Sequence, residues 1–186
     1  MKFAKQLVAL AVVGASFSAF AESDINTGAA AGLSAIARLD MRVTVPRIVY
    51  LQVGTGTAFT DVTTIDRVDF TLTAADVGSG LAIAGVSTGG AVTARVLGNG
   101  GNITFGAVGT VGGLTNGTQT IPWSQIVPTA TGGTLTHPAI SGATTSLVAV
   151  GNVVDRSTTY SFNYSNTSAM AAGTYNGQIT YTAALP

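Results

Sequence analysis

Apolar and polar residues alternate with a period of two in several parts of this chain. The longest run, residues 35–45, places five apolar side chains on one face and charged or hydroxyl side chains on the other; the apolar set is Ala37, Leu39, Met41, Val43 and Val45. Shorter runs follow at 68–72, 92–96 and 160–164. Successive side chains of a strand point to opposite faces, so each run predicts a strand with one face in a core.

Glycine-rich turn signals separate these runs, and no segment after residue 21 shows a sustained helical period. The last run places Tyr175, Ile179 and Tyr181 on one face, with Gly177 between them. Many short strands between such turns predict an all-β antiparallel sandwich. The stretch 129–145 has the weakest pattern and is expected to be a long loop.

Residues 1–21 have the composition of a secretory signal peptide. Lys2 and Lys5 precede an apolar run, and Ala19-Phe20-Ala21 fits a small-x-small cleavage site. Removal of this segment leaves six arginines against eight acids, a net charge of −2, and no lysine. We therefore expect an exported protein with an N-terminal extension at 22–45 and one sandwich domain at 46–186.

Composition excludes several classes of function. The near-neutral charge argues against a nucleic-acid partner, which requires a basic face. The absence of cysteine excludes disulfides, thiol nucleophiles and cysteine-ligated metals. Only 9% of the residues are charged, so the surface must consist mainly of threonine, serine, asparagine and glycine.

Isolated polar residues give no enzyme signature. His137 has no nucleophile or acid in a recognisable pattern and is interpreted as an ordinary loop residue. Four aspartates within residues 61–76 lack the spacing of a calcium-binding loop, and Trp123 is interpreted as a core or edge anchor. The sequence thus predicts a non-enzymatic protein with no catalytic residues, metal site or cofactor.

The two ends of the chain carry a family resemblance. The order of signal peptide, alternating strand, Pro46, apolar strand and closing Gly173-x-Tyr175-x-Gly177 segment resembles bacterial pilus subunits of the chaperone–usher type, and within them the cysteine-free colonisation-factor branch. The resemblance covers about 35 residues at the ends. It implies an immunoglobulin-like sandwich that lacks its final strand.

That resemblance implies a specific function. The chain would be a structural subunit of a surface pilus, or fimbrium, serving adhesion or biofilm formation. The 37–45 strand of one copy would fill the groove of the next, beside an edge formed by Tyr175, Ile179 and Tyr181. Expected partners are copies of the same chain, a periplasmic chaperone, an outer-membrane usher and a host or surface receptor.

Two alternatives remain open from the sequence. Residues 35–45 are equally suited to be the first strand of a complete sandwich, in a monomeric secreted module that binds carbohydrate or calcium. The inserted strand is also compatible with an earlier position, at 25–33. An alternating strand can pair within its own sheet or add to the sheet of another molecule.

Overall fold

A computed structural model describes residues 22–29, 31–56 and 59–186 of the chain. The proposed signal peptide, residues 1–21, lies outside the described residues. Internal contacts divide the chain into two units, Met1–Val45 and Pro46–Pro186, which are called the arm (residues 22–45) and the body below. The body is all-β, as predicted, and its strand pairs are antiparallel.

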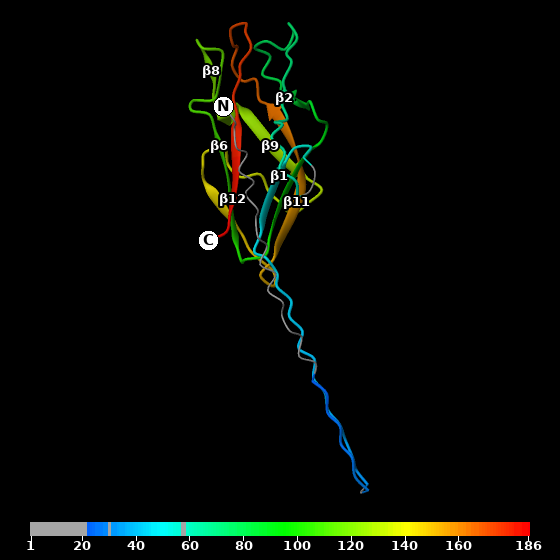
Figure 1. Ribbon diagram of the computed structural model, residues 1–186. Helices are drawn as coiled ribbons and strands as arrows, with labels where there is room; N and C mark the ends of the chain where they lie inside the picture. The colour runs from blue at the N-terminus through cyan, green and yellow to red at the C-terminus, as the bar shows by residue number, and fades with distance from the viewer. Residues whose placement is uncertain (1–21, 30, 57–58) are drawn as a thin grey trace, which may run out of the picture. The chain divides into compact units, whose positions relative to one another are not determined.

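Two main sheets build the body (Figure 1). In the first sheet β1 (Val49–Val53), β5 (Val92–Gly98), β11 (Val154–Tyr164) and β3 (Ile83–Ala84) follow one another, and β9 (Ile126–Thr131) also pairs with β11. The second sheet has the order β10 (Thr144–Leu147), β6 (Ile103–Gly109) and β12 (Ile179–Ala184).

Short elements complete the body. The two-residue strands β2 (Val68–Asp69) and β4 (Val86–Ser87) pair with each other, as do β7 (Leu114–Thr115) and β8 (Thr120–Ile121). A single 3-10 turn spans Trp123–Gln125. No α-helix in the described part of the chain has the length and apolar character needed to span a lipid bilayer.

The predicted alternation builds the core between the two main sheets. On β5 every second residue is buried, and on β11 the same holds from Thr158 to Tyr164; these inward side chains include Val92, Ala94, Val96, Tyr160, Phe162 and Tyr164. Ile103 and Phe105 of β6 belong to the same buried cluster. The strands predicted at 92–96 and 160–164 are therefore confirmed.

Two sequence expectations need correction. The final run enters a strand only at Ile179, so Tyr175 lies outside β12. The loop expected at 129–145 is confirmed over 132–143 but is shorter at both ends, because β9 continues to Thr131 and β10 begins at Thr144. Its middle runs between the two sheets: Thr134 N–H donates to the Ser157 carbonyl, and Ile140 forms a bridge with Ala107.

The arm consists of two extended stretches that lie side by side (Figure 1). The Ile36 N–H donates to the Asp24 carboxylate at 3.2 Å, and the Arg38 guanidinium pairs with Glu22 at 2.9 Å. Asn26 donates to the Ser34 carbonyl. Residues 22–26 are thus joined to 34–38, while no hydrogen bond among the described residues involves 39–45.

Candidate polymerisation site

The alternating run of the arm is extended but belongs to neither sheet. Leu39, Met41, Val43 and Val45 are 81%, 86%, 88% and 71% exposed. The interpretation of residues 35–45 as a strand paired within its own sandwich is therefore wrong for this structure. Single exposed apolar residues are ordinary, but four at a spacing of two make one apolar face along a single extended segment.

The alternative position of the inserted strand, 25–33, overlaps the stretch 22–26 and extends to the stretch 34–38. Ile25 and Leu33 are exposed there as well. The Asn26 side chain donates to the Ser34 carbonyl, which ties this segment to the same arm. Residues 39–45 carry a regular apolar face, and no hydrogen bond to another described residue involves their backbone, so they are the better candidate for insertion.

The first sheet of the body ends at a free strand edge. β1 pairs with β5 alone among the described strands. Gly54 N–H donates to Thr93 and Asn99 N–H donates to Ile48, which places the even-numbered residues of β1 in the hydrogen-bonded pairs. The N–H and C=O groups of Val49, Leu51 and Val53 consequently point away from β5 and remain available to another strand.

The second sheet ends in the same way at β12, whose single described partner is β6. Thr110 N–H donates to Gln178, so the even-numbered residues of β12 face β6. The backbone groups of Ile179, Tyr181 and Ala183 therefore point to the free side. β1 and β12 thus each present an unpaired edge formed by odd-numbered residues, and except for the exposed Val49 the side chains of these residues pack against the core.

An apolar cavity of about 350 Å³ opens between these two edges. Val53 and Val92 line it from the first sheet, and Ile179 and Tyr181 line it from β12. A second cavity of about 660 Å³ extends past Met170 and Tyr175. The residues that line both cavities are Arg67, Val68, Phe70, Leu114, Ile126 and Gly177. We call the continuous depression formed by the two cavities the groove.

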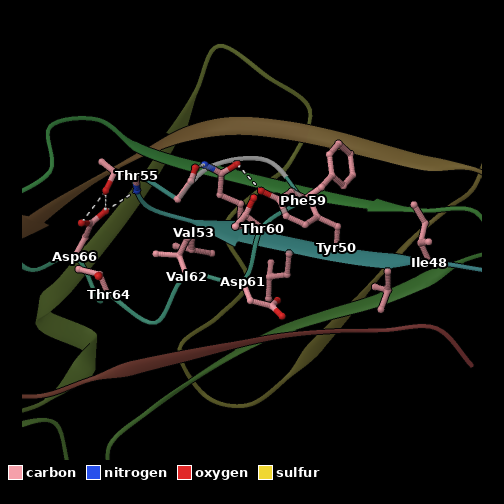
Figure 2. Close-up of a pocket in the computed structure, with 14 residues that line it drawn as sticks. Ile48, Tyr50, Val53, Thr55, Phe59, Thr60, Asp61, Val62, Thr64 and Asp66 are labelled. Atoms are coloured by element: carbon pink, nitrogen blue, oxygen red, sulfur yellow. Dashed lines mark hydrogen bonds between the residues drawn. The ribbon is translucent and has the colours of Figure 1, made fainter. Parts of the chain in front are cut away.

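A third cavity, of about 420 Å³, continues along the free edge of β1 and meets the groove at Val53 and Asp66 (Figure 2). Tyr50 and Phe59 lie together on one side of the strand, with ring centroids 5.0 Å apart. Asp61, Val62 and Thr64 come from the segment that runs beside β1 (Figure 2). Asp66 fixes the end of this segment by accepting hydrogen bonds from the Thr55 N–H and hydroxyl.

The residues predicted for the closing edge contribute to the groove in two ways. Ile179 and Tyr181 lie on β12, where both their backbone groups and their side chains border it. Tyr175 lies before the strand, and its hydroxyl bonds to the Ala171 carbonyl and the Gln119 side chain while the residue lines the second cavity. The structure therefore places all three predicted edge residues along one groove.

Several groove residues were not singled out in the sequence as site residues. Val68 and Phe70 were predicted only as members of an alternating strand, and Leu114 and Ile126 belong to elements too short or too irregular to show a period. Trp123 also lines the groove and donates its indole N–H to Thr110 at 2.8 Å. A Cβ on Gly109 would stand 2.1 Å from the Trp123 Nε1 atom, so glycine is required where the ring packs.

The aspartates considered for calcium make separate local contacts. Asp69 pairs with Arg67 at 2.7 Å, and Asp76 accepts from the backbone and hydroxyl of Thr73. These hydrogen bonds lower the pKa of Asp76. In the described ranges no group of three or more histidine, aspartate or glutamate side chains is placed to hold a metal ion.

No protein-family model matches this chain, and neither do the curated proteins or the solved structures with which it was compared.

Proposed function

We propose that this protein is a structural subunit of a surface fibre, in which the arm of one copy fills the groove of another. The observation that carries the proposal is a pair of complementary unsatisfied surfaces in one chain. The arm has a row of exposed apolar side chains, and the body has an apolar groove between two unpaired strand edges. Addition of an extended segment to a sheet edge satisfies backbone groups and apolar side chains together.

The residue spacing of the two parts agrees. The free edge of β12 presents backbone groups at Ile179, Tyr181 and Ala183, and the apolar face of the arm repeats at the same spacing of two. A strand of this kind buries alternate side chains and leaves the others in water. Leu39, Met41, Val43 and Val45 would enter the groove, and Arg38, Asp40 and Arg42 would stay outside.

Burial of these four side chains has a favourable free energy of about 1.5–3 kcal/mol each. Because the arm and the groove are different surfaces of the same chain, their union is head-to-tail, and such contacts generate open filaments when the rotation between subunits does not close a ring. The exported, pilin-like sequence features are consistent with assembly outside the cytoplasm. A fibre of this kind would serve adhesion or biofilm formation.

Truncation tests the proposal. A chain that lacks residues 22–45 should be a soluble monomer that binds a synthetic peptide of residues 35–46, and that peptide should raise its melting temperature. The chain from residue 22 onward should form filaments visible by negative-stain electron microscopy. A truncated chain that ignores the peptide, or a full chain that stays monomeric at high concentration, would contradict strand donation.

A further inference from the structure

His137 is half-buried in the body, in the segment that runs from the first sheet to the second. Leu135 and Pro138 on either side of it are buried. Three aromatic rings surround the imidazole, with centroids at 4.7 Å for Tyr160, 5.6 Å for Phe162 and 5.5 Å for Tyr181. The ring is therefore held between β11 and β12: His137 lies in an irregular segment, as predicted, but its ring is packed and hydrogen-bonded, unlike that of an ordinary loop residue.

The hydrogen bonds of His137 fix its tautomer. Nδ1 lies 2.6 Å from the Pro138 carbonyl, which can only accept, so Nδ1 carries the proton. Nε2 of the neutral ring is then an acceptor, and it lies 2.7 Å from the Tyr181 hydroxyl. Tyr181 donates to His137, and this bond ties the side chain of an edge strand to the interior.

Tyr181 is the middle residue of the free edge of β12. Its backbone N–H and C=O point to the open side, and its ring lines the groove. The orientation of this one side chain thus contributes both to the floor of the groove and to the position of the edge. Loss of the hydrogen bond to His137 would therefore free the Tyr181 side chain at the strand edge where an incoming strand would add.

We propose that His137 is a positioning residue of the groove, which holds Tyr181 in the strand-accepting orientation while neutral and releases it when protonated. The inference rests on the proposed function, because it concerns how the groove takes up the arm. It predicts that the groove binds the arm of another subunit with higher affinity at neutral pH than at acidic pH. The same residue would therefore make fibre assembly sensitive to the pH of the surroundings.

Within the described part of the chain the Pro138 carbonyl favours the protonated ring of His137, but no carboxylate faces it to balance a positive charge. The titratable groups that face it are Tyr160 from β11 and Tyr181 from β12, and the remaining ring is Phe162. Burial raises the pKa of both tyrosines, so they stay neutral, and burial lowers the pKa of His137. Protonation also turns Nε2 into a hydrogen-bond donor. The Tyr181 hydroxyl must then accept from Nε2 and donate its own O–H in a hydrogen bond to another acceptor.

The test uses the full chain with Met41→Glu, which keeps the groove but cannot donate its own arm. Binding of a fluorescent peptide of residues 36–46 is followed by anisotropy between pH 8 and pH 5. We expect the affinity of this chain to fall about tenfold across the range. In the Met41→Glu chain, His137→Ala should weaken peptide binding several-fold at pH 8. His137→Gln in the same chain should bind more tightly than His137→Ala and with an affinity that does not change with pH, because the amide oxygen accepts a hydrogen bond without titrating.

Tyr181→Phe supplies a second variant. Without the hydroxyl, peptide binding should be weaker at pH 8 and nearly independent of pH. An unchanged pH profile in His137→Gln, or a flat profile in the Met41→Glu chain itself, would overturn the inference while strand donation stands. Absence of peptide binding at every pH would overturn both the inference and the proposed function.

Discussion

Gly133 lies where the chain leaves β9 and approaches β11 too closely for any side chain. A Cβ at this position would stand 1.8 Å from the Ser157 carbonyl oxygen, which is backbone and cannot move aside alone. We expect Gly133→Ala to lower the free energy of unfolding by about 2–4 kcal/mol. Urea denaturation measures this, with Gly56→Ala as the matched control, since a Cβ there meets open space. Equal midpoints for the two variants would contradict the packing.

His137 also makes a prediction about stability. Burial lowers the pKa of the folded imidazole, whereas the unfolded residue titrates near its ordinary value of about 6.5. Below that value the unfolded state binds more protons, so folding stability is lost as the pH falls from about 6.5 towards 5. Thermal denaturation should show this loss, and His137→Gln should reduce it. The same loss in both proteins would mean that other groups cause it.

For single residues, the sequence predicted which side chains of a strand point into the core, but it did not predict contacts between residues that are distant in the chain. The period of two identified the inward residues of β5 and β11, because side chains alternate between the two faces of a strand and the face of one residue fixes the faces of its neighbours in the chain. His137 has no such neighbours: its polar, proline-containing surroundings are those of a loop, and its burial arises from Tyr160, Phe162 and Tyr181, which are distant in sequence. No local pattern could have placed it under β12.

Among the elements, the arm gives the most direct prediction. Met41→Glu places a charge in the middle of the apolar face, so it should prevent the arm from entering a groove and leave the chain monomeric in analytical ultracentrifugation. Thr44→Glu adds the same charge on the opposite face, which stays in water, and should leave filaments intact. Loss of filaments in both variants would indicate that charge alone, and not the apolar face, controls assembly.

The free edge of β12 can be tested by proline substitution. The Ala183 N–H points away from β6, so Ala183→Pro should keep the fold while removing one hydrogen-bond donor that β12 offers to the incoming strand, and peptide affinity should fall. Thr182→Pro instead removes a bond of the β6–β12 ladder and should lower the melting temperature. If Ala183→Pro binds the peptide as tightly as the parent, β12 is not the accepting edge.

Element length decided which strands the sequence revealed. The long strands β5 and β11 carry several alternations, and both were predicted. The run predicted at 68–72 forms a strand only over β2, and the two-residue strand β7 has no measurable period, although residues of both line the groove. The apolar face of residues 35–45 was visible in the sequence, but whether that face would be covered in its own sheet was a question of tertiary structure.

At the scale of the whole molecule, one chain carries both surfaces of the proposed contact between subunits. The arm and the body form separate units, and each leaves apolar groups and backbone groups unsatisfied. Both the all-β fold and the alternating arm could be predicted from the sequence. The two free edges could not, because an unpaired edge is defined by which strands are neighbours in space. The pilus assignment, with its chaperone, usher and receptor, stays a prediction.

Cross-linking between chains tests this claim most directly, because the sequence contains no cysteine. Chains with Met41→Cys are mixed with chains carrying Ile179→Cys and treated with a short bismaleimide. We predict a covalent product of two chains, and little product when the partner carries Ser161→Cys, which is exposed on the outer face of the first sheet. Equal yields with Ile179→Cys and Ser161→Cys, or no product between chains, would contradict donation of the arm to the groove.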